Sequence, residues 1–208
     1  MGVAAAERIA LCDLFEEVGP DAPTLCVGWR TKDLAAHLVL RERRIDAAAG
    51  ILVKPLAGHT RKTQDQIAAK PWAELVGLVR TGPPRWSPLA VPAVNEAVNS
   101  AEYFVHHEDV RRASPGWQPR PADPERDAVL WRAVNRVGRL GYRRSPVGVA
   151  LRRPDGTLVT AKQAPNTVTI TGEPGELLLW SFGRDEARVE FDGSDEAVSA
   201  VRGLKRGF

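Results

Sequence analysis

Residues 95–113 read NEAVNSAEYFVHHEDVRRA and are predicted to lie in a long helix that runs from about Ala93 to Ala113. Because successive residues of a helix are rotated by about 100°, an apolar stripe forms on one side: Val94, Val98, Ala101 and Val105. Beside it falls a polar stripe, which consists of Asn95, Asn99, Glu102, His106 and Asp109. We expect the apolar stripe to face the core, and His107, on the opposite side, to be exposed.

A polar stripe beside a core is costly unless its members are paired or bind a ligand. Glu102 and His106 lie one turn apart and can reach one cation, and carboxylate and imidazole are ligands of Zn²⁺ and related divalent metals. His37, on another predicted helix, is the candidate third ligand. Three protein ligands leave a position open for water or substrate, and Asp109 or an asparagine would orient a ligand. The alternative is that Glu102 pairs with an arginine while both histidines pack in the core.

The first two thirds of the chain have the periodicity of helices. Besides the helix above, we predict helices over residues 4–18, from Thr31 as N-cap to about Gly50, over residues 72–80, and from Asp123-Pro124 to about Arg144. The intervening residues 83–92 are too rich in proline for a helix or a central strand.

The last third alternates between polar and apolar residues, as strands do. Strands are predicted over residues 147–153 and 157–163, joined by a Pro-Asp-Gly turn, and over residues 166–172 and 187–193. Helices are predicted over residues 173–182 and after Ser194. We therefore predict an α+β protein with a boundary near Ser145-Pro146, in which a helical bundle (residues 1–145) precedes a small α+β domain (residues 146–208).

The composition is that of an ordinary globular protein. Among 208 residues, 29 Lys and Arg nearly balance 26 Asp and Glu, without the basic patch of a nucleic-acid-binding protein. No apolar run approaches the length of about 20 residues that crosses a bilayer, so we expect neither a nucleic-acid nor a membrane role. The N-terminal segment lacks the pattern of a signal peptide, which favours a cytoplasmic protein. Cys12 and Cys26 are interpreted as small buried residues, with a nucleophile or an extra metal ligand as the alternative for Cys26, and His59 as a surface residue in a loop.

Three segments resemble the DinB-like superfamily that includes the mycothiol-dependent maleylpyruvate isomerases. Residues 24–38, TLCVGWRTKDLAAHL, resemble its Cys-x-Gly-Trp signature and first metal-binding histidine. Residues 102–113, EYFVHHEDVRRA, resemble its second metal segment, and residues 168–184, VTITGEPGELLLWSFGR, resemble its C-terminal domain. The resemblance covers nearly the whole chain and is strongest to a branch of short actinobacterial metal-binding proteins of unknown substrate.

The resemblance implies a DinB-like four-helix bundle that holds a divalent metal, zinc foremost, on His37, Glu102 and His106. It also implies mycothiol as a thiol cosubstrate, whose thiolate would take the open metal position and attack a small electrophile in an isomerisation or a transfer. Arg184 is the candidate catalytic arginine of the C-terminal domain. The hydroxyl groups of mycothiol would suit three polar residues, which would otherwise support the ligands or the helix packing: Asn95, Asn99 and Asp109.

Two other functions stay open at this point. A metal-water hydrolase would need Asp109 or Glu108 as general base, whereas a non-catalytic module would only bind the metal, a thiol or a partner protein. Arg41, one turn after His37, would either face an anionic substrate or belong to a solvated face with Arg43 and Arg44. We expect a monomer or a homodimer.

Overall fold

The computed structural model describes residues 1–48, 50 and 53–206, which divide into two compact units, Met1–Gln118 and Pro119 onward. The first unit is helical and the second combines helices with a mixed sheet, so the predicted α+β class is confirmed. Among its described residues the first unit contains α1 (Val3–Val18), α2 (Thr31–Arg43), α3 (Ile45–Ala48), α4 (Ala57–Ala68), α5 (Trp72–Thr81), α6 (Pro92–Arg111) and the short 3-10 turns η2 (Lys54–Leu56) and η3 (Pro88–Ala90). No helix in these described ranges combines the length and hydropathy that crossing a bilayer requires.

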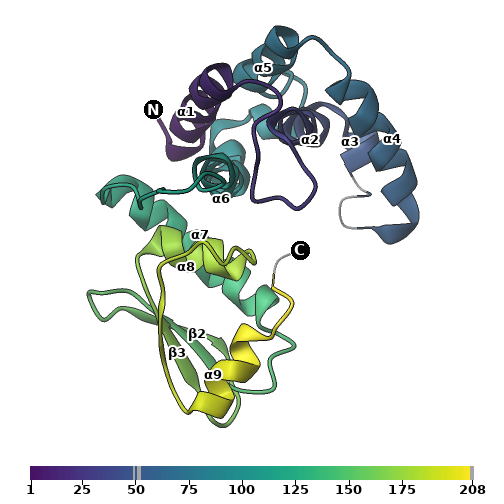
Figure 1. Ribbon diagram of the computed structural model, residues 1–208. Coiled ribbons are helices and arrows are strands. Elements are labelled where there is room, and N and C mark those ends of the chain that lie inside the picture. The colour runs from purple at the N-terminus through teal and green to yellow at the C-terminus, as the bar shows by residue number, and fades with distance from the viewer. Residues whose placement is uncertain (49, 51–52, 207–208) are drawn as a thin grey trace. The chain divides into compact units, whose positions relative to one another are not determined.

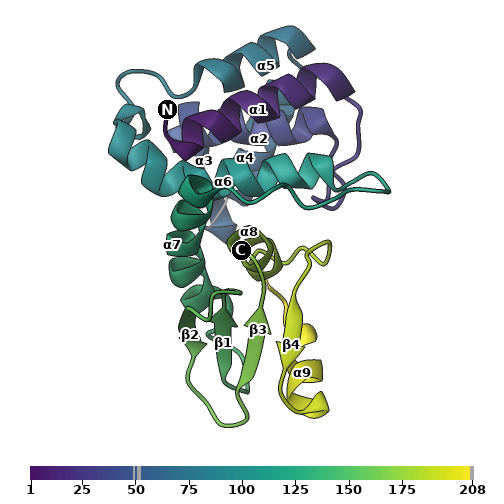
Figure 2. The same ribbon diagram turned by 90° about the vertical axis from the view of Figure 1, so that its left-hand side faces the viewer.

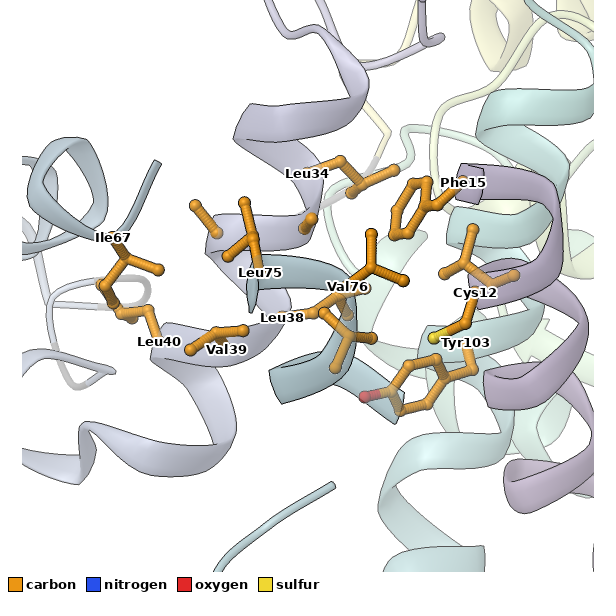
Figure 3. Packing of buried hydrophobic residues seen from close by; sticks show 14 of the residues in the cluster. Cys12, Phe15, Leu34, Leu38, Val39, Leu40, Ile67, Leu75, Val76 and Tyr103 are labelled. Atoms are coloured by element: carbon orange, nitrogen blue, oxygen red, sulfur yellow. The ribbon is translucent and has the colours of Figure 1, made fainter. Parts of the chain in front are cut away.

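The core of the first unit is built mainly from α1, α2, α5 and α6, and Ala47 of α3 and Ile67 of α4 also belong to it. The helix α1 packs along α6, and α2 packs against α4 and α5 (Figure 1). Figure 3 shows Leu38 of α2 and Val76 of α5 beside Cys12 and Phe15 of α1. Tyr103 of α6 lies in the same cluster. Because these side chains are buried almost completely, the core fixes how α2 and α6 face one another.

The burial of α6 agrees with the prediction only in part. Val105 of the expected core stripe is buried, but Val94 and Val98 are 37 % and 43 % exposed, whereas Asn99 and Asp109 of the polar stripe are fully buried. The reason is that the polar groups find partners on neighbouring helices, which offsets the cost of burying them. His107 is buried rather than exposed, and its Nδ1 lies 2.9 Å from Oε2 of Glu7 on α1.

Other details of the helical unit also differ from the sequence-based expectation. The helix α2 ends at Arg43 rather than near Gly50, and it is capped by Arg30 rather than Thr31. The hydroxyl of Thr31 instead donates to the carbonyl of Gly19 at 2.5 Å, while Asp33 accepts a hydrogen bond from the backbone N–H of Arg30. The helix α4 was not predicted. It contains His59, which is exposed as expected but lies in a helix rather than a loop.

The second unit contains α7 (Pro124–Gly141), β1 (Val149–Arg152), β2 (Leu158–Lys162), β3 (Val168–Thr171), α8 (Pro174–Ser181), β4 (Glu190–Asp192) and α9 (Asp195–Arg202). Figure 2 shows the strands in the order β2-β1-β3-β4. The hairpin β1–β2 is antiparallel, β1 and β3 are parallel, and β3 and β4 are antiparallel. The predicted hairpin and the cap at Ser194, whose Oγ accepts from the backbone N–H of Ala197, are confirmed.

The division between the units falls before α7, not after it. This helix packs against α8 and β2, and the hydroxyl of Tyr142, just beyond its end, lies 3.4 Å from Oγ of Ser181. The boundary expected near Ser145-Pro146 placed α7 with the preceding helices. Its helical period could not reveal which neighbour covers its apolar face, because that information is tertiary.

Gly138 marks the contact between α7 and the sheet. A Cβ at this position would lie 2.9 Å from Cδ1 of Leu151 and 3.4 Å from Cβ of Ala161. We expect Gly138→Val to lower the free energy of unfolding by about 1–3 kcal/mol through overpacking. The matched change Gly77→Ala in α5, where an added Cβ meets nothing within 4 Å, should raise it by about 0.5–1 kcal/mol. Denaturant titration checks both values, and a Gly138→Val protein as stable as the wild type would contradict this packing of α7.

Candidate metal centre

Two helices bring His37, Glu102 and His106 together. His37 lies in α2, and the other two residues lie one turn apart in α6. The Nε2 atoms of both histidines are 3.3 Å from the same oxygen, Oε1 of Glu102, and one ligand atom of each residue lies within 4.8 Å of the others. The exposed fraction of the side chain is 10 % for His37, 18 % for Glu102 and 10 % for His106. The cluster is therefore nearly closed to solvent.

The spacing of these atoms fits a metal ion. A tetrahedral Zn²⁺ ion with ligands at about 2.0–2.1 Å separates neighbouring ligand atoms by about 3.3–3.4 Å. The two N–O distances of 3.3 Å match this separation. Two imidazole nitrogens and one carboxylate oxygen are also a donor set that zinc and related divalent cations accept. These residues would therefore hold a cation through three protein ligands and leave a further position free.

The other ring nitrogen of His106 is occupied by a hydrogen bond. Nδ1 lies 2.9 Å from Oδ2 of Asp109, which is fully buried. When Nδ1–H donates to this carboxylate, the lone pair of Nε2 points toward Glu102 and His37. This supports the expectation that Asp109 orients a ligand of the cluster.

Cys26 contacts the same carboxylate. Its Sγ–H donates to Oδ2 of Asp109 at 3.2 Å, and Cys26, His106 and Asp109 form a second group with ligand atoms within 4.8 Å. The distances of 2.9 and 3.2 Å in this group are hydrogen-bond lengths. They are shorter than the separation of about 3.3–3.5 Å between nitrogen, oxygen or sulfur ligands of one zinc ion. Cys26 is half-buried rather than buried as predicted, and its thiol has a polar partner rather than the purely apolar surroundings of a small core residue.

Arg41 reaches the cluster from α2. Its Nε lies 3.3 Å from Oε1 of Glu102, and its Nη1 donates to Oδ1 of Asn99. The side chain is 18 % exposed, so Arg41 belongs to the cluster rather than to a solvated face. Its position four residues after His37 was the available signal, because residues i and i+4 share a face of a helix.

Asn99 joins Arg41 to a buried ion pair. Its amide N–H groups donate to Oε1 of Glu42 at 3.0 Å and to Oδ1 of Asn95 at 2.7 Å. Glu42 in turn accepts two hydrogen bonds from Arg8, at 2.7 and 2.6 Å. The contacts of the two asparagines are therefore those of helix packing, the alternative to binding a thiol. In this series of hydrogen bonds Asn99 links the cation of Arg41 to the anion of Glu42, and Glu42 pairs with the cation of Arg8. The opposite charges compensate for the burial of these groups.

Burial and hydrogen bonding act in opposite directions on the charges of the cluster. Burial would raise the pKa of Glu102, but hydrogen bonds with His106 and His37 hold this pKa well below its ordinary value, so the carboxylate is ionised. Burial lowers the pKa of His37. Burial would also lower the pKa of His106, but its hydrogen bonds with Asp109, Cys26 and Glu102 together outweigh this, and the pKa is raised well above its ordinary value. A proton and a cation compete for Nε2 of His106, so a cation that binds there displaces a proton.

Arg184 and Cys12 lie outside the cluster, whereas Trp29 lies beside it. Arg184 belongs to the second unit, where its backbone N–H donates to the carbonyl of Leu179 and its Nη1 donates to that of Phe182. Cys12 is buried as expected, and burial raises the pKa of its thiol to about 12, which makes it unreactive at neutral pH. The centroids of the Trp29 and His37 rings are 5.2 Å apart.

The role of Asp109 can be tested through cation affinity. Asp109→Asn keeps the size of the side chain but removes the charge that holds Nδ1–H of His106. We expect it to weaken Zn²⁺ binding by about 10–100-fold, as is typical when such an orienting carboxylate is lost. Calorimetric titration measures this, with Asp46→Asn on the surface as control. Equal affinities for Asp109→Asn and the wild type would show that this hydrogen bond does not support the site.

Comparison with models of known protein families, with curated proteins and with solved structures finds no match for this chain.

Proposed function

We propose that this chain is a metal-dependent enzyme that activates a low-molecular-weight thiol for attack on a small electrophile. The observation that carries the proposal is the pair of imidazole nitrogens, each 3.3 Å from one carboxylate oxygen of Glu102. The resemblance to DinB-like four-helix bundles suggests zinc as the metal and mycothiol as the thiol. It also suggests a cytoplasmic protein, where such thiols are kept reduced, that acts on small molecules as a monomer or a homodimer.

The charges around the cluster favour an anionic ligand at the open position. Arg41 contributes one positive charge, and Glu102 and Asp109 contribute one negative charge each. Arg8 and Glu42 neutralise one another. A dication therefore leaves one net positive charge in a nearly closed site, which is costly unless it is compensated. A monoanion such as a thiolate would make the site neutral.

Each residue of the site has a separate role in the proposed reaction. A bound Zn²⁺ ion would lower the pKa of a coordinated thiol enough to ionise it at neutral pH. His37, Glu102 and His106 would hold the cation, and Asp109 keeps Nε2 of His106 directed at it. The thiolate sulfur would then form a bond to the electrophilic carbon, either with loss of a leaving group or, for a conjugated acid, with breaking of the C=C π bond to an enolate, which expels the thiolate after rotation and so re-forms the double bond. Arg184 is the proposed catalytic arginine of the second unit.

The structure gives the hydrolase alternative no support, because the two candidate general bases are engaged elsewhere. Asp109 is fully buried and accepts from His106 and Cys26. Glu108 is also fully buried, and its carboxylate accepts from Arg111 at 2.7 Å and from Arg112 at 2.5 Å. A metal-water hydrolase requires a carboxylate that can take a proton from the water, and the hydrogen bonds of these two carboxylates do not favour that role.

The test uses Co²⁺-loaded protein, because a thiolate that binds Co²⁺ produces a charge-transfer absorption. We expect mycothiol to give a saturable band that His37→Ala abolishes, and the Zn²⁺-loaded protein to consume a chlorodinitrobenzene with release of chloride only when the thiol is present. Arg184→Ala should lower turnover while thiol binding is retained. Turnover without thiol would support the hydrolase, and cation binding without thiol binding would support a non-catalytic module. Either result would overturn the proposal.

A further inference from the structure

The loop before α2 is attached to Asp109 at two points. The backbone N–H of Leu25 donates to the carbonyl oxygen of Asp109 at 3.0 Å, and the thiol of the next residue, Cys26, donates to its carboxylate at 3.2 Å. Asp109 lies in α6 and is fully buried. This loop therefore forms hydrogen bonds with Asp109, whose carboxylate contacts Nδ1 of His106.

The loop itself is rigidly folded around Cys26. The hydroxyl of Thr24 donates to the carbonyl of Trp29 at 3.0 Å and accepts from the backbone N–H of Cys26 at 3.2 Å. The backbone N–H of Trp29 closes a turn onto the carbonyl of Cys26 at 2.9 Å. Gly28 has a φ of 80°, a conformation that glycine adopts without strain. Hydrogen bonds within the loop thus help to set the position of the Cys26 sulfur.

We propose that Cys26 is a positioning residue of the cation site rather than a ligand: its S–H fixes Asp109, and Asp109 fixes His106. This inference rests on the proposed cation site and adds a residue to it. Both donors share one oxygen, Oδ2 of Asp109, so loss of the thiol removes a contact that helps to define where this oxygen lies. His106 then loses orientation, although none of the three ligands has changed.

The two cysteines of the chain make this inference testable by chemical modification. Cys26 is half-buried, whereas Cys12 is fully buried. N-ethylmaleimide adds across its double bond, so that sulfur bonds to one alkene carbon and the thiol proton ends on the other. In the folded protein we expect it to modify Cys26 and to spare Cys12. The product lacks the S–H donor and places a bulky group beside Asp109.

The experiment measures Zn²⁺ affinity by calorimetry and the absorption spectrum of the Co²⁺-loaded protein. We expect Cys26→Ala and alkylated wild type to bind Zn²⁺ about tenfold more weakly than the wild type, at the lower end of the effect of losing an orienting group. The serine hydroxyl is also a donor, so Cys26→Ser should retain the wild-type affinity within about threefold, since a neutral hydrogen bond contributes little on balance. Cys12→Ser is the control, which should keep the affinity and its response to alkylation.

Several outcomes separate this role from the alternatives. A sulfur-to-cobalt charge-transfer band without added thiol, or two Zn²⁺ ions per chain, would show that Cys26 is itself a ligand and overturn the inference. Equal affinities for the wild type, Cys26→Ser and Cys26→Ala would also overturn it, while the cation site would stand. If the wild type binds no cation, the proposed function fails together with this inference. A merely structural role would lower the melting temperature of cation-free Cys26→Ala without shifting the visible bands of the Co²⁺-loaded protein, which we expect to shift.

Discussion

Glu102→Gln is expected to abolish Zn²⁺ binding under conditions where the wild type binds one ion per chain. Oε1 of Glu102 is the atom that both histidines share, at 3.3 Å from each Nε2. The amide oxygen of glutamine is neutral and is not among the usual ligands of zinc. The change also removes the negative charge that, with Asp109, offsets a dication and Arg41 in a nearly closed site. His37→Ala and His106→Ala should have the same effect, because each removes a ligand.

Controls for these variants come from the surface of the same unit. Glu74→Gln removes a carboxylate whose side chain is 48 % exposed, and His59→Ala removes an imidazole that is 53 % exposed. Neither residue belongs to the cluster, so both variants should bind Zn²⁺ as the wild type does. Calorimetric titration combined with elemental analysis gives affinity and stoichiometry. Wild-type binding by Glu102→Gln would rule out the carboxylate as a ligand.

The second large effect is expected at the buried ion pair of Arg8 and Glu42. Their side chains are only 7 % and 2 % exposed, with 2.6 Å between Nη2 and Oε1. Arg8→Met leaves a buried carboxylate without its cationic partner, and removal of one member of a buried pair costs about 3–5 kcal/mol. Arg8 also donates to the hydroxyl of Tyr103 and to the carbonyl of Val79, which adds to the loss.

The double variant Arg8→Met/Glu42→Leu tests whether the cost arises from the stranded charge. An apolar pair of similar volume is often as stable as a buried ion pair or more so, so the double variant should recover most of the stability that Arg8→Met loses. The surface variant Arg80→Met is the matched control. Its guanidinium is 34 % exposed and pairs with Asp13 and Glu16, and such pairs contribute about 0–1 kcal/mol. If denaturant titration gives Arg8→Met and Arg80→Met equal losses, the buried pair does not have the role assigned here.

Periodicity identified which residues share a face, but not which face is buried. The spacing of Glu102 and His106, together with a histidine on another helix, was enough to select the three residues that the structure brings together. The same reasoning put Val98 toward the core, whereas it is 43 % exposed. The polar stripe of α6 is buried because Glu42 and His37 on α2 supply its partners, and a single helix contains no information about partners on another.

The residues whose contacts the sequence did not predict are those whose partners lie far away in the chain. Cys26 lies 83 residues from Asp109 in the chain, and Arg8 lies 34 residues from Glu42. Each type of residue has a more common role, the cysteine as a small core residue and the charged pair as part of a solvated surface. The strands and the hairpin of the second unit were predictable because they depend on local alternation and turn residues, whereas the place of α7 depends on distant strands.

The most direct test of the cation site is X-ray absorption spectroscopy of the Zn²⁺-loaded wild type without added thiol. The arrangement of His37, Glu102 and His106 predicts a first shell of nitrogen and oxygen only, at about 2.0–2.1 Å, with the multiple scattering that imidazole rings produce. A sulfur shell at about 2.3 Å would place the ion on Cys26, and a shell of oxygen without imidazole would place it outside the cluster. Either spectrum would contradict the site described here.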